Sequence, residues 1–333
     1  MPDKTRIALA LGSGGARGYA HVGAIQVLEE RGYEIVSVAG TSMGALVGGL
    51  YAAGRLDEYA EWAGGLSQRD LFRLLDPSLR APGAIRGEKI LARVSDLLAG
   101  AVIEDLPIPF TAVATDLLAR KEVWFQRGPV DVAIRASIAL PGVFTPVMLN
   151  GRLLADGGLM NPVPIAPTTS SRADLTVAVS LAGEDDDVGK TPVTTSSEPE
   201  PPDEWRDRLR RQAAQVLDRD IVRAVTRRTG VRSATDETEP SAPELLVEEE
   251  VEGPTRALFE SLPPGLGALD VMELSLDAMQ SLVTRFRLAA YPPDLLVTVP
   301  KSACRTLDFH KGAEMIALGR RLTEEALDRH PLG

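Results

Sequence analysis

The chain has 333 residues, of which 44% are hydrophobic and 25% charged, and its 36 Lys and Arg against 47 Asp and Glu leave a net charge of −11. This composition is typical of a globular protein with a sizeable core, and it excludes a disordered chain or a bundle of membrane helices. An acidic total also argues against a general nucleic-acid binder, because neutralising phosphates requires a basic surface. Cys304 is the single cysteine, so there is no internal disulfide and no cysteine-based zinc site, which fits a reducing compartment.

Predicted strands and helices alternate along most of the chain. Short apolar runs rich in β-branched residues indicate strands, and apolar residues at a spacing of three or four indicate helices. The alternation predicts βαβ units and an α/β fold, a three-layer α/β/α arrangement with a mainly parallel sheet. The predicted strands cover residues 5–11, 35–39, 110–115, 122–125, 152–155, 175–181 and 295–299, and the predicted helices cover residues 18–31, 42–53, 57–62, 87–98, 130–138 and 312–327.

A glycine-rich stretch, Gly12–Gly18 (GSGGARG), follows the first predicted strand and opens a helix. Its four glycines let the backbone turn N–H groups toward one point, and the helix N-terminus behind them favours negative charge. The negatively charged group that this loop would bind is either a phosphate or an oxyanion. No acidic residue ends the second strand, as a dinucleotide site would require, and the absence of GK[ST] excludes a P-loop.

A second motif, Gly40–Gly44 (GTSMG), also lies between a strand and a helix and fits the nucleophile-elbow pattern G-x-S-x-G. The two glycines allow a strained turn that lifts the serine hydroxyl clear of the backbone. We therefore identify Ser42 as the candidate nucleophile. The pattern is frequent by chance, so its position directly after an anion-binding loop carries the argument.

The candidate base is harder to choose, because a serine hydroxyl needs a group that takes its proton. The three histidines are His21 in the first predicted helix, His310 ahead of the last helix, and His330 near the C-terminus. Only His310 is placed to complete a Ser-Asp-His triad. An α/β-hydrolase elbow also follows more strands than precede Ser42, so we expect the base to be a carboxylate.

Asp156 supplies such a carboxylate, in Asp156–Gly158 (DGG) after a short predicted strand. An Asp followed by two glycines is most often an ordinary turn. The alternative is a carboxylate held at the C-terminal edge of a strand, where α/β active sites gather. Its unperturbed pKa of ~3.9 makes it a weak base, and partial desolvation would raise that pKa toward a useful value.

Together the three motifs resemble, in order and spacing, the signatures of the patatin-like phospholipases, and most closely the bacterial branch related to neuropathy target esterase. The segment Ala136–Phe144 (ASIALPGVF) is similar to the segment that precedes the Asp motif in that family. The resemblance covers about residues 5–182 and resumes near residues 269–318. Ser13 stands where the family commonly has a third glycine, a departure that also occurs in this branch.

The resemblance implies a patatin-like fold and a serine lipid acyl hydrolase of the phospholipase or lysophospholipase type. Ser42 would attack the ester carbonyl, and Asp156 would accept its proton and later activate water. Backbone N–H groups around Gly14 and Gly15 would form the oxyanion hole, with Arg17 holding the loop or meeting a substrate phosphate. The remaining motif residues would support these turns: Gly12, Gly18, Gly40, Gly44, Gly157 and Gly158.

Several alternatives remain open at this point. They are an α/β-hydrolase-like esterase with a Ser42-Asp156-His310 triad, a lipid transacylase that uses the same dyad, and a lipid-binding regulatory protein with a vestigial site. We expect no metal and no cofactor, because histidine and cysteine are scarce and the acid clusters lie in stretches that we expect to be disordered. The expected partner is a lipid substrate, nucleic acid is not expected, and the oligomeric state is open.

The net charge is concentrated in two stretches rich in Pro, Ser, Thr and Glu. Glu184–Glu204 carries −7 and Asp236–Glu252 carries −8, so the rest of the chain carries +4. We predict a catalytic domain over residues 5–330, interrupted by an acidic, partly disordered insertion at 184–254 that contains a basic amphipathic helix at 205–229. Such a helix either packs on the domain or lies on an anionic membrane surface.

No membrane span or export signal is predicted. Residues 35–54 carry no charge, but their five glycines fit a strand, a turn and a helix better than a span. The apolar run near the N-terminus is too short for a signal peptide. We expect a cytoplasmic protein, with peripheral contact at the inner membrane face as an open alternative.

Overall fold

The structure is a computed structural model that describes residues 4–67, 69–70, 83–85, 88–183 and 268–332. The chain divides into two compact units, Met1–Glu200 with Leu276–Gly333, and Pro201–Ser275. The predicted insertion at 184–254 and its helix at 205–229 lie outside the described residues, so these boundaries stay a prediction. The first unit contains the sheet and all three motifs.

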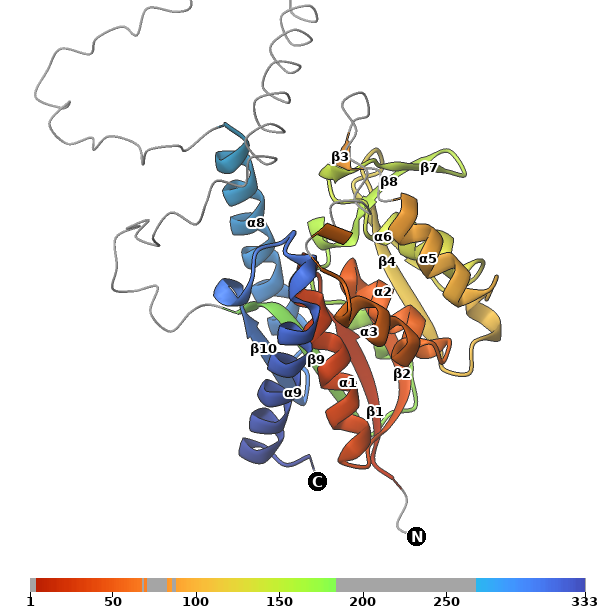
Figure 1. Cartoon of the computed structure of the whole chain (residues 1–333). Coiled ribbons are helices and arrows are strands. Elements are labelled where there is room, and N and C mark those ends of the chain that lie inside the picture. The colour runs from red at the N-terminus through yellow and green to blue at the C-terminus, as the bar shows by residue number, and fades with distance from the viewer. Residues whose placement is uncertain (1–3, 68, 71–82, 86–87, 184–267, 333) are drawn as a thin grey trace, which may run out of the picture. The chain divides into compact units, whose positions relative to one another are not determined.

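A mixed sheet of eight strands forms the centre of the first unit, in the order β10-β9-β1-β2-β4-β8-β7, with β5 also paired to β4 (Figure 1). The pairs from β10 to β4 are parallel, whereas β5, β7 and β8 pair antiparallel. The central strands are apolar on both faces because helices or loops cover both faces. The strands are β1 (Arg6–Leu11), β2 (Glu34–Thr41), β4 (Phe110–Asp116), β5 (Lys121–Phe125), β7 (Val147–Leu149), β8 (Arg152–Asp156), β9 (Leu175–Gly183) and β10 (Leu295–Pro300), and a separate small sheet pairs β3 (Gly83–Ile85) with β6 (Gly142–Phe144).

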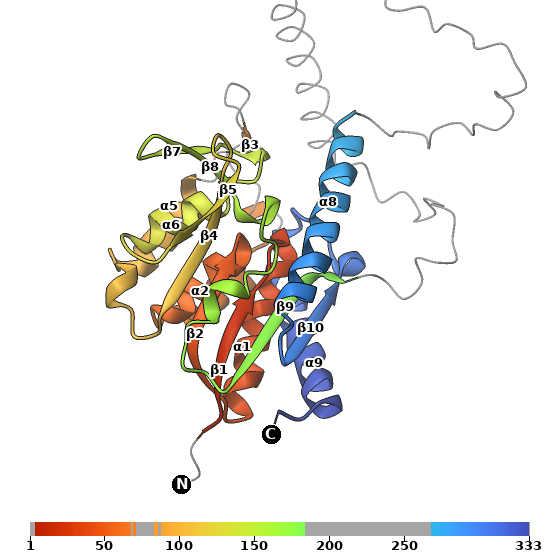
Figure 2. The same cartoon turned by 180° about the vertical axis from the view of Figure 1, so that it is seen from behind.

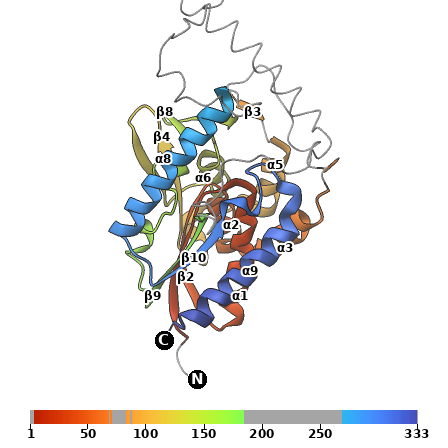
Figure 3. The same ribbon diagram turned by 90° about the vertical axis from the view of Figure 1, so that its left-hand side faces the viewer.

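Helices cover both faces of this sheet. One face carries the main core and α1 (Ala20–Glu30), α2 (Met43–Ala52), α3 (Leu56–Gly64), α5 (Glu88–Leu98), α6 (Val130–Ser137) and α9 (Gly312–Arg329). The other face carries α8 (Ala268–Ala290), whose Leu288 packs against a smaller cluster that includes Ala10 and Ala178. Figure 2 shows α8 beside β9 and β10, and Figure 3 shows it across the sheet from α1 and α9. The predicted three-layer α/β/α fold is confirmed.

Most predicted elements match the structure within a few residues, and one long helix was not predicted. The first helix begins with a 3-10 turn, η1 (Gly15–Tyr19), before α1 continues it. The sequence analysis did not predict α8, whose apolar residues do not gather on its buried side. Met279, Leu282 and Phe286 of α8 have exposed fractions of 58%, 54% and 70%. They recur at helical spacing but lie on the exposed side of the helix, so their pattern does not mark the side that packs on the sheet.

The uncharged stretch 35–54 folds as most of β2, a sharp turn and α2, as predicted, rather than as a membrane span. Within the described ranges, every helix is too short or too polar to cross a bilayer.

Candidate active site

Strand register brings the two candidate catalytic residues together. Thr41 of β2 pairs with Val113 of β4, and the next β4 residue, Ala114, pairs with Asp156 at the end of β8. Ser42 directly follows Thr41, so its side chain lies level with Asp156 across β4. Ser42 Oγ donates a hydrogen bond to Asp156 Oδ2 at 2.5 Å. Asp156 ends its strand as predicted, although β8 runs antiparallel to its neighbour β4.

The turn that carries Ser42 is strained in the way a nucleophile elbow requires. Ser42 has φ 57° and ψ −122°, a backbone conformation rare for any residue with a side chain. Space is also short on both sides: a Cβ on Gly40 would lie 2.2 Å from the Gly44 carbonyl oxygen, and one on Gly44 would lie 2.1 Å from the Leu11 carbonyl oxygen. Glycine at position 40 therefore lets the turn close against the start of α2, and glycine at position 44 lets α2 pack against the end of β1.

Residues 137–139 accept hydrogen bonds from the backbone N–H groups of both candidate residues. The Ser42 N–H donates to Ser137 Oγ at 2.9 Å, and that hydroxyl donates to the Val113 carbonyl at 2.6 Å. The Asp156 N–H donates to the Ala139 carbonyl at 2.9 Å. The sequence marked this segment only through its resemblance to a family segment. It missed the role of Ser137, because an isolated serine carries no signal that it will accept a distant backbone N–H.

Asp156 is buried, with 1% of its surface exposed, and its carboxylate makes two hydrogen bonds. Oδ2 accepts from Ser42, and Oδ1 accepts from the Gly158 N–H at 2.7 Å. Burial raises the pKa of Asp156 from 3.8 to about 6, although the two hydrogen bonds lower it in part. A carboxylate with such a pKa accepts a proton near neutral pH more readily than an ordinary Asp does.

The carboxylate contacts the serine hydroxyl directly, with no imidazole between them. His310 lies in the short turn η7 (Phe309–Lys311) ahead of α9, and in the part of the chain that the structure describes no hydrogen bond joins it to Ser42 or Asp156. The structure thus brings together the Ser and Asp of the predicted dyad and leaves His310 apart.

The glycine loop leaves two backbone donors free. The N–H groups of Gly12, Ser13 and Ala16 each donate to a backbone carbonyl at 2.8–2.9 Å. The N–H groups of Gly14 and Gly15 have no acceptor among the described residues. Gly15 has φ +58°, and a Cβ there would lie 2.4 Å from the Thr306 carbonyl oxygen. The loop therefore presents the two donors that the sequence predicts for an oxyanion hole, and that role stays a prediction.

Side chains behind the loop hold its carbonyl groups. Arg17 donates from Nε to the Gly14 carbonyl and from Nη1 to the Lys301 carbonyl, each at 3.2 Å, so Arg17 has the loop-holding contact that the sequence left as one of two options. Buried His21 lies with Nε2 2.8 Å from the Gly12 carbonyl oxygen. A carbonyl only accepts, so Nε2 carries the proton. Burial lowers the pKa of His21 to about 4, which keeps the ring neutral.

The three motifs pack against one another as one unit. A Cβ on Gly18 of the glycine loop would lie 2.3 Å from Cβ of Met43 in the elbow helix, and one on Gly158 would lie 2.7 Å from Ser13 Oγ. The same shortage of space, with a contact under 3.0 Å, applies to Gly12 and Gly157. No group of three His, Cys, Asp or Glu side chains that could hold a metal ion occurs within the described residues.

Sheet order, elbow and glycine loop define the class of protein, and comparison with known proteins agrees. The family model for patatin-like phospholipase matches residues 9–169. An uncharacterized NTE family protein of Mycobacterium tuberculosis is 51% identical over 336 residues, covering 97% of this chain and 91% of that protein. The lysophospholipase NTE1 of Cryptococcus neoformans is 34% identical over 187 residues, covering 54% of this chain and 11% of that protein. Among solved structures, VipD from Legionella pneumophila has a TM-score of 0.48 at 16% identity, covering 99% of this chain and 67% of that one.

The chain belongs to the NTE family of patatin-like phospholipases, which confirms the resemblance read from the motifs. Membership of this family makes the protein an enzyme of the esterase class that hydrolyses lipids.

The raised pKa of Asp156 predicts a stability change for Asp156→Asn. The folded pKa of about 6 lies above the ordinary 3.8, so the contribution of this group to stability is complete below pH 3.8 and is lost as the pH rises through 6. The amide removes that loss and can still pair with Ser42. We expect the variant to gain up to about 3 kcal/mol in free energy of unfolding at pH 8. Urea unfolding at pH 8 and pH 4 measures it, and a gain of equal size at both pH values would contradict this origin.

Proposed function

We propose that the protein is a serine lipid acyl hydrolase that cleaves carboxylic esters of phospholipid or lysophospholipid through a Ser42–Asp156 dyad and a glycine-loop oxyanion hole. The observation that supports this most is the 2.5 Å hydrogen bond from Ser42 Oγ to the buried Asp156 carboxylate. A relative named as a lysophospholipase supports the substrate class.

In the first half-reaction, Ser42 Oγ attacks the ester carbonyl while its proton passes to Asp156 Oδ2. The carbonyl oxygen becomes an oxyanion, which the N–H groups of Gly14 and Gly15 stabilise with fixed dipoles. As the tetrahedral intermediate collapses, the C–O bond to the alcohol breaks, and protonated Asp156 gives its proton to the leaving alkoxide. An acyl ester on Ser42 remains.

In the second half-reaction, water replaces the alcohol. Asp156, again a carboxylate, takes a proton from water as the hydroxide attacks the acyl-serine carbonyl. The same two N–H groups meet the new oxyanion. The bond to Ser42 breaks, its Oγ recovers the proton from Asp156, and the fatty acid leaves. Each step uses the one carboxylate as base and then as acid, so no histidine is needed.

The direct contact between carboxylate and hydroxyl favours this dyad over a Ser42-Asp156-His310 triad, in which an imidazole would stand between them. A transacylase would follow the same first half-reaction and replace water by another acceptor. The strained elbow and the raised pKa of Asp156 argue against a purely lipid-binding protein, since backbone strain is kept where function needs it.

We further propose that the protein is cytoplasmic and contacts a membrane peripherally. Outside its two acidic stretches the chain carries +4, which suits an anionic lipid surface. Met279, Leu282 and Phe286 recur at helical spacing on α8 and are all more than half exposed. Exposed apolar side chains on one side of a helix suit insertion among lipid head groups.

Activity variants test the dyad. Ser42→Ala and Asp156→Asn should each lower fatty-acid release from lysophospholipid by at least about 10³-fold, because the nucleophile or its base is lost. His310→Ala should keep kcat within about twofold. Mass spectrometry of released fatty acid measures the rates, with and without added acyl acceptor. Activity in Ser42→Ala would sink the proposal, and loss of activity in folded His310→Ala would favour the triad.

The pH dependence of kcat/KM gives a second test. Asp156 acts as a base only when ionised, and its pKa is about 6, so kcat/KM should fall tenfold per pH unit below about pH 6. A stopped hydrolysis assay from pH 4.5 to 8 measures the profile. An acidic limb near pH 4, the range of an ordinary Asp, would contradict a desolvated base.

Vesicle binding tests the membrane proposal. Deleting Glu184–Glu204 removes a charge of −7, so the fraction bound to anionic vesicles should rise several-fold at low salt. Sedimentation with anionic vesicles measures the effect, and zwitterionic vesicles serve as the control. Unchanged binding would end the idea that this stretch opposes membrane contact.

A further inference from the structure

Helix α8 is the first described element after β9, and from Leu276 onward it belongs to the same unit as the active site. Its polar side chains reach two separate loops of that site. One set of contacts leads to the glycine loop and the other to the loop after Asp156. The side chains that α8 itself contributes to these contacts lie outside the three sequence motifs.

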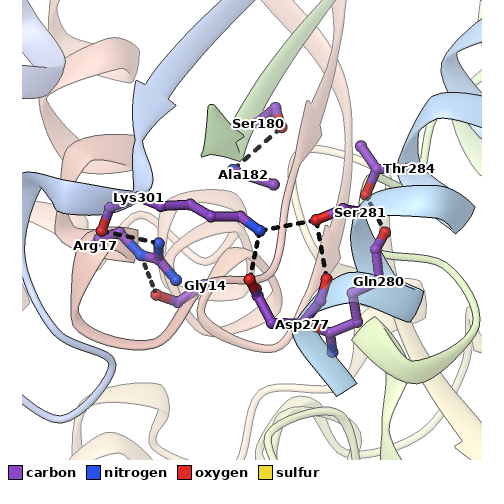
Figure 4. A network of polar contacts seen from close by, with 9 residues as sticks. All are labelled: Gly14, Arg17, Ser180, Ala182, Asp277, Gln280, Ser281, Thr284 and Lys301. Atoms are coloured by element: carbon purple, nitrogen blue, oxygen red, sulfur yellow. Dashed lines mark hydrogen bonds and ion pairs between the residues drawn. The ribbon is translucent and has the colours of Figure 1, made fainter. Parts of the chain in front are cut away.

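The first set passes through Lys301, which directly follows β10 (Figure 4). Lys301 Nζ donates to Asp277 Oδ2 at 2.6 Å and to Ser281 Oγ at 2.7 Å, and both acceptors lie on α8. The Lys301 carbonyl accepts from Arg17, whose Nε in turn donates to the Gly14 carbonyl. Two residues thus connect α8 to the glycine loop.

Holding the Gly14 carbonyl fixes one of the two free donors of that loop. In a trans peptide the carbonyl of one residue and the N–H of the next point in opposite directions. The Gly14 carbonyl and the Gly15 N–H belong to one peptide, so Arg17 sets the direction of the Gly15 N–H. Glycine on both sides leaves this peptide free to rotate, so hydrogen bonds must hold it.

The second set passes through Glu122 of β5. Arg287 of α8 forms an ion pair with Glu122 and also donates to the Met160 carbonyl at 3.3 Å. Glu122 Oε2 accepts from Asn161 Nδ2 at 2.8 Å and from Trp124 Nε1 at 2.9 Å. Burial raises the pKa of Glu122, but these hydrogen bonds outweigh it and leave the pKa below its ordinary value. The carboxylate therefore stays ionised and holds three donors.

Asn161 connects Glu122 to the turns that hold Ser42 and Asp156. Its backbone N–H donates to the Gly157 carbonyl at 2.8 Å, directly after Asp156. Its backbone carbonyl accepts from Thr41 Oγ1 at 2.9 Å, directly before Ser42. With 1% of its surface exposed, Asn161 is fixed where the two turns meet.

We propose that α8 is a positioning element of the active site, with Lys301 and its α8 partners orienting the oxyanion peptide and the Arg287–Glu122 pair orienting the Ser42 and Asp156 turns. The inference rests on the proposed function. These residues act through others and touch neither substrate nor reacting atoms, so they are positioning residues.

The exposure of these pairs separates positioning from stability. The side chains of Lys301 and Asp277 are 27% and 44% exposed, and those of Arg287 and Glu122 are 27% and 19% exposed. Both ion pairs keep contact with water, so each contributes less to folding than a fully buried pair would. Removing them should therefore cost catalysis much more than stability, because small displacements of catalytic groups lower the rate steeply.

The experiment uses the full chain and two double-mutant cycles, Asp277→Asn with Lys301→Met and Glu122→Gln with Arg287→Met. The matched control is Glu30→Gln with Arg320→Met, an ion pair between α1 and α9 whose partners are 59% and 32% exposed. The measurements are kcat and KM on lysophospholipid, the inhibition constant of an acyl trifluoromethyl ketone that forms an oxyanion on Ser42, and the melting temperature.

We expect either cycle's variants to lower kcat by about 10- to 100-fold with KM within about threefold, and the control to change neither. The trifluoromethyl ketone should bind more weakly in parallel with kcat in the Lys301 cycle. Lys301→Arg should restore most of the rate, because it keeps a cation for Asp277. Within each cycle the double variant should lose no more than the worse single variant.

Three results would overturn the proposal: unchanged kcat in folded variants, losses of kcat that only follow a fall in melting temperature, or single losses that multiply in the double variant. Labelling of Ser42 by a fluorophosphonate separates this from failure of the proposed function. If wild type neither hydrolyses lipid nor labels, the proposed function fails. If wild type labels, unchanged labelling rates in the variants overturn only the positioning role.

Discussion

The hydrogen bond between Ser42 and Asp156 is the contact on which the rest of the site depends. A carboxylate gains the pKa of a useful base only by leaving water, and burial of Asp156 raises its pKa to about 6. That burial requires a strand, β8, running antiparallel beside β4, and a strained elbow that lifts Ser42 to meet it. The hydrogen bonds that the carboxylate accepts from Ser42 Oγ and the Gly158 N–H offset part of the cost of desolvation.

His21 and Asp156 show two uses of a buried titratable group. Burial lowers the pKa of His21 to about 4, so folding loses its contribution as the pH falls from about 6.5 to 4. Burial raises that of Asp156, so stability is lost in the opposite direction, as the pH rises from 3.8 to about 6. The two slopes oppose each other in the same pH window. His21 donates its Nε2 proton to the Gly12 carbonyl and is thereby a structural donor, whereas Asp156 is the base in the proposed mechanism.

The sequence could predict the features that depend on contiguous residues. The strands, the elbow and the glycine loop are contiguous motifs, so their secondary structure and their candidate residues could be predicted from short stretches of sequence. Ser137 and the Arg287–Glu122 pair were not, because each depends on a partner far along the chain, 165 residues apart in the case of the ion pair. α8 was not predicted either: its apolar side chains face solvent as well as the sheet, so their spacing does not mark a buried face.

The order of the chain explains why α8 matters to a site built mostly before residue 161. β9 packs against the glycine loop, with Leu181 Cβ at 2.5 Å from where a Gly14 Cβ would stand, and the Gly12 N–H donates to Val179. β9 ends at Gly183, and the described chain resumes at the start of α8. Both ends of the intervening segment are thus elements that contact the site. Hydrogen bonds connect α8 to the Gly14–Gly15 peptide and to the turns that carry Ser42 and Asp156. In the proposed mechanism, one helix would therefore support both the dyad and the oxyanion donors.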